Sequence, residues 1–398
     1  MINTNPEKIK EVLERGVSEV VVKEELQKKL LSGKSLRIYF GIDPTSPNLH
    51  LGHTVVLRKL RAFQDLGHEV ILLIGDFTAR IGDPTQRDAA RVPLTEKQVK
   101  DNFKDYKKQA AKVLDFKKLK VKYNSQWLSK LNFADIIKLA SNFTVQQMLA
   151  RDMFARRMQE NKPINLQEFL YPLMQGYDSV YMDVDLEVAG NDQIFNALAG
   201  RDLQKIYHNK DKDVLTTKLL LGTDGRKMSK TFGNTISLSD SPNDMFGKVM
   251  SMQDQLIYDY FDLCTGVPLQ ELAEIKNKLA SGQNPRDIKA RLAKEIVAMY
   301  NGKDAAEKAE KEFDSVFRNK EMPTDIPTFE TAKENYPILD LLFDAKLTDS
   351  KSEAKRLVEG GGVEINKQKI QDWKQEIKIE DGMIIQAGKR KFIKIKKI

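Results

Sequence analysis

The chain has 398 residues, of which 41% are hydrophobic and 31% are charged, with one cysteine and a formal net charge of +8. This length exceeds what a single hydrophobic core supports, so two or three domains are predicted. The lone Cys264 excludes an internal disulfide and a cysteine-based metal site, which predicts a cytoplasmic location. The sequence lacks the apolar run of about 18 residues that a membrane span needs, and its charged first residues are unlike a secretory signal.

The positive charge is concentrated at the C-terminal end. Residues 351–398 contain 13 Lys and Arg against 7 Asp and Glu, whereas the first 350 residues are nearly balanced, with 52 against 50. A near-neutral body followed by a basic end is typical of a polyanion-binding module joined to another domain. A Lys-rich solubilising surface has the same composition, so charge alone leaves both interpretations open.

The N-terminal third has the pattern of a βαβ unit. Apolar spacing predicts an amphipathic helical segment over residues 6–31, a strand over 36–43, a helix over 52–66 and a strand over 69–75. The second strand is a continuous apolar run, as expected for a parallel strand that is buried on both faces. Strand, helix and strand in this order predict a parallel sheet.

The alternation continues and is then interrupted. Thr95 and Gln98 predict a capping box at the start of a long polar helix. Further strands are predicted at 118–123, 184–188 and 215–221. The mostly helical stretch 132–182 separates the first two of these strands, which indicates an insertion into the sheet fold.

The C-terminal half changes character at residue 241. Ser241 and Pro242 predict an N-cap followed by a first-turn proline, and helical patterns continue to about residue 318. The stretch 322–337 contains three prolines and is interpreted as a linker. Beyond it, Ser350 and Glu353 predict a capping box, a short helix and then several β-like runs.

These elements predict an α/β protein with a Rossmann-like parallel-sheet catalytic domain followed by an α-helical domain and a small α+β domain. The predicted boundaries are 1–235 with an insertion at about 125–182, 236–321 for the helical domain, 322–337 for the linker and 338–398 for the last domain.

Two short motifs carry the chemistry. PTSPNLHLGH at 44–53 joins the first strand to the first helix, where amide groups and the helix dipole favour phosphate and His50 and His53 share a helical face. GRKMSKTFGN at 225–234 places Lys227 and Lys230 in a loop after a late strand, which suits a phosphate whose charge grows in a transition state. Taken singly, each is equally typical of a surface helix or a solvated loop.

Together the motifs resemble the signature pair of class I aminoacyl-tRNA synthetases. Residues 39–54, 81–84 (IGDP), 171–178 (YPLMQGYD) and 190–193 (GNDQ) are similar to the bacterial tyrosyl-tRNA synthetase family in particular. The resemblance runs from about residue 10 to the C-terminus. It implies activation of tyrosine with ATP to tyrosyl-adenylate, followed by transfer to the terminal adenosine of tRNA.

The resemblance assigns roles by position. It implies a tyrosine pocket formed by Tyr39, Thr78, Asp83, Asn124, Tyr171, Gln175, Asp178 and Gln193. It implies ATP contacts from Gly41, Asp43, Gly52, Gly190, Asp192, Met228, Ser229 and Thr231, and catalytic groups at Thr45, His50, His53, Arg87, Arg91, Lys227 and Lys230. Mg²⁺ is expected to arrive with ATP, and no metal ligands in the protein are expected.

Each assignment has a plainer alternative. Tyr39 and Asp178 match the positions that read the phenol hydroxyl, but a strand aromatic is often core and a helix acid is often exposed. Asp83 is also a typical turn residue, and Asp192 a typical N-cap. Reading a hydroxyl with buried polar groups rejects phenylalanine by about 10⁴–10⁵, for which tyrosyl enzymes are themselves the standard example.

The resemblance also implies partners. The last 60 residues are similar to a small RNA-binding domain first known from a ribosomal protein, with Lys351, Lys355, Arg356, Lys389, Arg390 and Lys391 as candidate phosphate contacts. A homodimer through the helical insertion is expected. Three other functions remain open at this point, namely a tryptophanyl enzyme, a catalytically silent RNA-binding relative and an adenylyltransferase that acts on a small molecule without tRNA.

Overall fold

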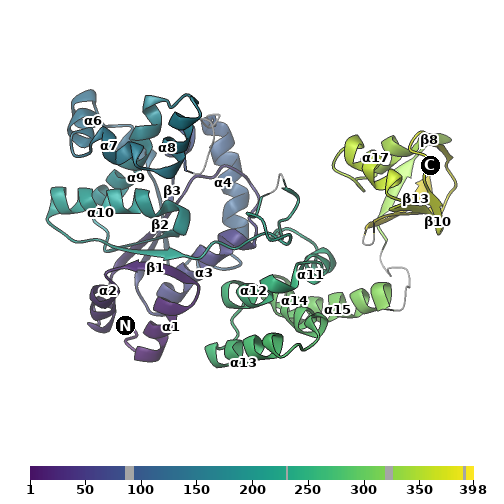
Figure 1. Ribbon diagram of the computed structural model, residues 1–398, viewed down its shortest axis with the longest axis horizontal. Helices are drawn as coiled ribbons and strands as arrows, with labels where there is room; N and C mark the ends of the chain where they lie inside the picture. The colour runs from purple at the N-terminus through teal and green to yellow at the C-terminus, as the bar shows by residue number, and fades with distance from the viewer. Residues whose placement is uncertain (86–93, 230–231, 319–325, 389–390) are drawn as a thin grey trace.

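The computed structural model describes residues 1–85, 94–229, 232–318, 326–388 and 391–398. Figure 1 shows a large body that contains the sheet and most helices, and a smaller C-terminal unit to one side of it. In the described part of the chain, no helix is long and apolar enough to cross a membrane.

The body is built around a six-stranded sheet. The strand order is β1 (Val17–Val21), β6 (Asp213–Thr217), β5 (Leu186–Gly190), β2 (Arg37–Ile42), β3 (Glu69–Ile74) and β4 (Leu119–Tyr123). All neighbours are parallel except β1, which runs antiparallel to β6. The strand β3 is buried along almost its whole length, as its apolar run predicts. The predicted parallel-sheet α/β fold is confirmed.

The continuous helical segment predicted over 6–31 is wrong. The chain forms α1 (Pro6–Glu14), then β1, then α2 (Lys23–Leu31). Gly16 and Val22 both adopt a positive φ of 60°, which ends one helix and separates the strand from the next. The three valines between them have high β propensity and pair with the open edge of the sheet. The last predicted strand also ends earlier than expected, at Thr217.

Helices cover both faces of the sheet. α3 (Leu51–Asp65) follows β2, and α4 (Glu96–Ala110) begins at the predicted capping box of Thr95 and Gln98. The insertion contains α5 (Ser125–Leu128), α6 (Phe133–Ala140), α7 (Val145–Leu149), α8 (Asp152–Gln159) and α9 (Leu166–Met182). α10 (Ile194–His208) packs closely along α9.

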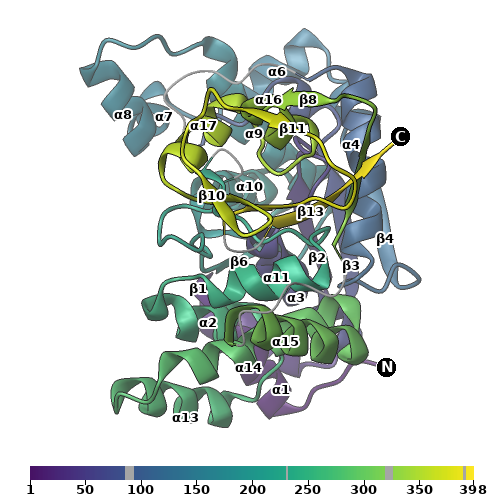
Figure 2. The ribbon, with the colours of Figure 1, turned by 90° about the vertical axis from the view of Figure 1, so that its right-hand side faces the viewer.

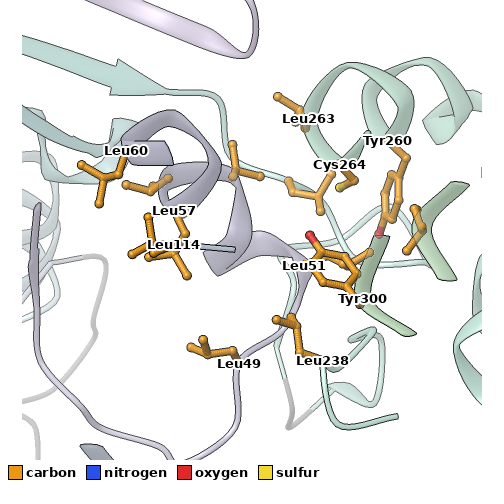
Figure 3. Close-up of a cluster of buried hydrophobic side chains, with 14 of the residues drawn as sticks. Leu49, Leu51, Leu57, Leu60, Leu114, Leu238, Tyr260, Leu263, Cys264 and Tyr300 are labelled. Atoms are coloured by element: carbon orange, nitrogen blue, oxygen red, sulfur yellow. The ribbon is translucent and has the colours of Figure 1, made fainter. Parts of the chain in front are cut away.

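The second helical region lies at the opposite end of the body from the insertion in both views (Figures 1 and 2). It contains α11 (Pro242–Met250), α12 (Ile257–Cys264), α13 (Leu269–Ala280), α14 (Pro285–Asn301) and α15 (Lys303–Arg318). The Ser241 side chain caps α11 as predicted. Figure 3 shows that Leu57 and Leu60 of α3 belong to the same apolar cluster as Tyr260, Cys264 and Tyr300 of this region.

A buried lysine joins α3 to α1. Lys59 of α3 donates to the backbone oxygens of Val12 and Arg15, both at 2.6 Å, at the C-terminal end of α1. Positive charge at a helix C-terminus interacts favourably with the helix dipole. Burial lowers the pKa of Lys59 to about 7. The helix that begins at the first motif is therefore held against α1 through Lys59.

The C-terminal unit has its own core. Its helices are α16 (Ile338–Asp344) and α17 (Lys351–Glu359). Its strands are β7 (Thr328–Thr331), β8 (Asn335–Pro337), β9 (Val363–Ile365), β10 (Gln368–Ile370), β11 (Glu376–Lys378), β12 (Ile384–Ala387) and β13 (Lys391–Lys397). Five strands form one sheet in the order β10-β9-β12-β13-β7.

Two local predictions for this unit need correction. The stretch interpreted as a linker over 322–337 contains β7 and β8, because Thr328 pairs with Lys394 and Tyr336 with Ile377. Ser350 caps α17, but the Glu353 carboxylate accepts from the amide of Asp349 at 2.8 Å instead of that of Ser350. The capping box is therefore only half formed.

Candidate active site

A cavity of about 630 Å³ opens at the carboxyl ends of β2, β3 and β5 and is closed on one side by α9. This edge of a parallel sheet is where ligands bind in doubly wound folds. Seventeen of the residues singled out in the sequence line it, namely Gly41, Asp43, Thr45, His50, Gly52, His53, Thr78, Asp83, Asn124, Tyr171, Gln175, Asp178, Gly190, Asp192, Gln193, Lys227 and Met228.

Six predicted residues are not among these. Tyr39 and Ser229 are described but do not line the cavity. Arg87, Arg91, Lys230 and Thr231 lie outside the described residues.

The first motif forms an interlocked helix start. His50 is the N-cap of α3 and His53 is its N3 residue, so the two side chains lie on the same side of the helix start, as predicted. The His50 amide donates to Nδ1 of His53 at 3.2 Å, and the two rings lie 3.9 Å apart. The pair therefore faces the cavity as one unit.

The two motifs are in direct contact. The amide of Leu51 donates to the Ile236 carbonyl at 3.0 Å, just beyond the second motif. A Cβ on Gly52 would lie 3.1 Å from the His50 ring and 3.4 Å from the Met228 sulfur, so glycine gives these groups their close approach. About 170 residues of sequence thus separate groups that are neighbours in space.

The second motif is cross-linked by Asn234, which the sequence analysis did not single out. Its Oδ1 accepts from the Ser229 amide at 2.8 Å, and its Nδ2 donates to Asp224 at 2.7 Å and to the Lys227 carbonyl at 3.1 Å. One buried amide side chain therefore sets the shape of the loop around Lys227. It stands in the quoted motif, but a loop asparagine gives no signal of such a role.

The deep end of the cavity is a closed polar network. Asp178 is 2% exposed and accepts from Trp127 Nε1 at 2.7 Å and from Asn124 Nδ2 at 3.2 Å. Burial raises the pKa of Asp178 well above its usual value. The alternative of a surface helix acid is therefore wrong. Asn124 also donates to Thr78 Oγ1 at 3.1 Å, which ties Thr78 to the same network.

Tyr39 lies behind this network. Its side chain is fully buried on β2, and its hydroxyl is 2.8 Å from Ser179 Oγ on α9. Burial raises the pKa of Tyr39 well above its ordinary value. Tyr39 is therefore buried beside the deep end of the cavity, and its hydroxyl is held by Ser179.

Several acceptors line the middle of the cavity. Tyr171 donates its hydroxyl proton to Asp43 at 2.9 Å, and Gln193 Nε2 donates to Asp83 Oδ2 at 2.8 Å. The other oxygen of Asp83 accepts from the Thr85 amide at 2.9 Å, so Asp83 is both a turn residue and a cavity residue. Tyr171 and Gln175 lie one turn apart on α9, as their spacing predicts.

The part of the cavity near Lys227 contains a partly buried acid, Asp192. Burial raises the pKa of Asp192, while the nearby charge of Lys227 acts in the opposite direction. A Cβ on Gly190 would lie 2.9 Å from the Asp192 carboxylate, so glycine leaves room for it. Within the described ranges, no group of three or more His, Cys, Asp or Glu side chains could hold a metal ion.

Glu187 completes the deep wall and is backed by Lys212, which also contacts Ser179, and none of the three was predicted as a site residue. Glu187 lines the cavity and accepts from Gln175 Nε2 at 3.0 Å and from the Lys212 ammonium. Lys212 stands in the charged run KDKD, a pattern typical of a solvated loop, so its burial leaves no trace in the sequence.

The candidate RNA contacts are spread over the C-terminal unit. Lys351 pairs with Asp340 at 2.7 Å, and Lys391 donates to the Leu347 carbonyl at 2.9 Å. Lys355 lies on the same helix as Arg356, with its ammonium 4.0 Å from the centre of the Trp373 ring. Lys389 and Arg390 lie outside the described residues.

Two family models match the chain. The model for tRNA synthetases class I (W and Y) matches residues 31–318, and that for the tyrosine–tRNA ligase SYY-like C-terminal domain matches residues 319–395.

Known proteins are similar over nearly the whole chain. The tyrosine–tRNA ligase of Moorella thermoacetica is 49% identical over 390 residues, covering 96% of this chain and 94% of that protein. That of Thermotoga maritima is 46% identical over 392 residues, covering 98% of each. The crystal structure of tyrosyl-tRNA synthetase from Archaeoglobus fulgidus complexed with L-tyrosine is 25% identical, with a TM-score of 0.61, and covers 77% of this chain and 100% of that one.

Proposed function

The chain belongs to the tyrosine–tRNA ligases of class I, and from that premise we propose how its residues divide the two-step reaction. The enzyme joins tyrosine to tRNA at the expense of ATP. The observation that carries the division of roles is the convergence of both motifs and of the buried Asp178 network on one cavity. The tryptophanyl and catalytically silent alternatives are not favoured by these relatives.

We propose that tyrosine lies with its phenol at the deep end. Asp178 is the phenol acceptor there, because its carboxylate is fixed by Trp127 and Asn124 and lines the cavity. Tyr39, which the resemblance also assigns to the phenol, is proposed to read it together with Asp178, with its own hydroxyl held by Ser179. The ammonium group is held by Tyr171, Gln175 and Asp83, with Thr78 and Gln193 as the surrounding wall.

The phosphate chemistry falls to the outer end. The tyrosine carboxylate oxygen attacks the α-phosphorus, a new O–P bond forms, and the bond to pyrophosphate breaks. The residues supply positioning and charge, and no side-chain nucleophile is required. We propose that Thr45, His50, His53 and Lys227 stabilise the departing phosphates, together with Lys230, Arg87 and Arg91 from the family positions.

ATP binding is proposed for the remaining cavity residues. Gly41, Asp43, Gly52, Gly190, Asp192 and Met228 surround the space beside the first motif, with Ser229 and Thr231 following in the loop. Three cavity carboxylates already have partners. Asp43 accepts from Thr78 and Tyr171, Asp83 accepts from Gln193, and Asp192 lies near the charge of Lys227. These donors do not form a cage for an ion, so Mg²⁺ is proposed to bind through the ATP phosphates.

The C-terminal unit is proposed to bind tRNA through its basic surface. Lys351, Lys355, Arg356 and Lys391, with Lys389 and Arg390, give phosphate contacts that position the RNA without reading its sequence. We propose a catalytic domain over 1–235 with the insertion at about 125–182, a helical domain to 321, and an RNA-binding unit that begins at β7, earlier than residue 338.

We also propose a homodimer through the insertion. The exposed apolar side chains gather there, including Phe133 at 78%, Val145 at 63% and Leu166 at 81% exposure. Several exposed apolar side chains in one region are typical of a protein interface. A cytoplasmic location is proposed because tRNA charging takes place there and Cys264 is a buried free thiol.

Pyrophosphate exchange against a panel of amino acids tests this proposal. Exchange should depend on tyrosine, with phenylalanine and tryptophan nearly inactive. Exchange with tryptophan in place of tyrosine would contradict the assignment of Asp178. Absence of exchange with every amino acid, in a folded protein, would contradict the catalytic assignment as a whole.

A further inference from the structure

Lys212 is a fully buried lysine beside the tyrosine end of the cavity, to which none of the roles above gives a function. It stands immediately before β6. Its ammonium donates to the carboxylate of Glu187 on β5 and to Ser179 Oγ on α9, the latter at 2.9 Å. A buried ammonium is costly unless it is paired and hydrogen-bonded, and here Glu187 and Ser179 supply both the pairing and the hydrogen bonds.

The surrounding fold makes room for this one ammonium group. α9 and α10 cross at Gly176 and Gly200. A Cβ on Gly200 would lie 2.6 Å from Lys212 Nζ and 2.8 Å from Ser179 Oγ. A Cβ on Gly176 would lie 2.7 Å from Leu203 and 3.2 Å from the Gly200 backbone. Gly200 therefore leaves the space that the lysine ammonium occupies, and Gly176 lets the two helices approach closely.

The ion pair controls the orientation of a cavity residue. Glu187 accepts from Gln175 Nε2 at 3.0 Å with the carboxylate oxygen that Lys212 does not contact. An ionised carboxylate can only accept hydrogen bonds, so it selects the Gln175 conformer that points the amide NH₂ at Glu187. The Gln175 carbonyl oxygen then points the other way and remains an acceptor.

We propose that Lys212 and Glu187 are positioning residues that orient Gln175 so that its amide oxygen receives the α-amino group of tyrosine. This inference rests on the role proposed above for Gln175. Lys212 keeps Glu187 charged, Glu187 holds the amide nitrogen, and the amide oxygen faces the ligand. Without Lys212, a neutral Glu187 could donate to Gln175 and reverse the amide, which would turn an NH₂ group towards an ammonium ion.

The experiment compares three ligands that differ at the amino group. Tyrosine and tyramine carry it, whereas 3-(4-hydroxyphenyl)propionate lacks it and keeps the phenol. Dissociation constants are measured by equilibrium dialysis without ATP on the full-length protein. Lys212→Met should weaken tyrosine and tyramine about tenfold, the effect of losing one charge-assisted hydrogen bond, and should change the deaminated ligand less than about twofold.

A second variant protects the test against misfolding. Lys212→Met alone leaves a buried carboxylate without its partner, which is strongly destabilising in general. The double variant Glu187→Gln with Lys212→Met removes both buried charges, so it should fold. The introduced amide can donate to Gln175, so the same selective loss of tyrosine and tyramine affinity is expected. Lys210→Met is the matched control, because Lys210 is partly exposed and pairs with Asp183 and Asp185.

A double-mutant comparison locates the effect at Gln175. In a Gln175→Met background, the Glu187 and Lys212 changes together should cost no further tyramine affinity, since the group that they orient is gone. Equal weakening of all three ligands, or tyrosine binding as tight as wild type in the folded double variant, would overturn the inference. If the wild-type protein itself bound no tyrosine, the proposed function would fail instead.

Discussion

The two ends of the cavity are built in different ways. At the tyrosine end, Asp178, Gln175 and Glu187 are held by other side chains, and each hydrogen bond has a partner fixed on a neighbouring strand or helix. At the phosphate end, His50 and Lys227 are placed by backbone bonds between two chain segments and by the single side chain of Asn234.

The difference matches what each end has to do. Tyrosine keeps one shape and charge from binding to adenylate, so rigid, satisfied side chains can select it. The phosphates gain and redistribute charge during the reaction, so the groups around them contribute most in the transition state. Selection and rate acceleration are therefore expected to respond to different substitutions.

The largest effect is expected at the deep end. Asp178→Ala removes the proposed phenol acceptor, leaves the Trp127 donor unpaired and takes one of two acceptors from Asn124 Nδ2. The tyrosine kcat/KM in pyrophosphate exchange should fall roughly 10³-fold, within the range by which hydroxyl-reading sites reject analogues. The preference for tyrosine over phenylalanine should fall by a similar factor. An unchanged preference would show that another group reads the phenol.

The next effect is expected at the phosphate end and should have the opposite kinetic signature. His50→Ala should lower kcat of adenylate formation roughly 10²-fold with little change in the tyrosine KM, because its contact is made in the transition state. The matched control is His208→Ala, a partly exposed histidine at the end of α10. A rise in KM with unchanged kcat would contradict the division between the two ends.

A smaller effect is expected at Gly200, where the absence of a side chain leaves room for the Lys212 ammonium beside the deep end. Gly200→Ala places a Cβ 2.6 Å from Lys212 Nζ and should reduce the free energy of unfolding by about 1–3 kcal/mol. Urea unfolding measures this loss, and the tyrosine KM should rise with it. Gly266→Ala is the control, since nothing lies within 4 Å of its Cβ position. Equal stability of the two variants would show that the crossing is not close-packed.

The smallest effect on adenylate formation is expected far from both ends. Ending the chain at residue 318 removes the C-terminal unit and should change tyrosine-dependent exchange by less than about twofold, because the two parts have separate cores. Charging of tRNA should fall strongly, and the intact enzyme should show a steep salt dependence of charging. Unimpaired charging by the shortened chain would contradict the RNA-binding role.

Much of the cavity lining can be predicted because its residues stand in short motifs. His50 follows a predicted strand, and the carboxyl ends of parallel strands meet at one edge of the sheet, whereas Asp83, Gln175 and Asp178 are assigned from the resemblance, the last two on α9. The contact of Tyr39 with Ser179 could not be predicted, because it depends on how α9 packs against β2.

What the sequence could not show is pairing between distant segments. The sequence of β1 looks helical, because its valines fit the 3.6-residue period of a helix as well as the two-residue period of a strand. Only pairing with β6 makes this segment a strand. The burial of Lys212 cannot be predicted from its charged run, because it depends on the space left by Gly200 in α10. In both cases the deciding contact is long-range, and local composition carries no record of it.

The crossing of α9 and α10 also links the evolutionary histories of three positions. A residue larger than glycine at 200 would displace the ammonium of Lys212, and loss of that ammonium would leave Glu187 unpaired. Each single replacement is therefore expected to be harmful in the presence of the other two. Relatives with glutamine at the position of Glu187 are expected to lack the lysine and to tolerate alanine at position 200, so these residues should be inherited or exchanged as a set.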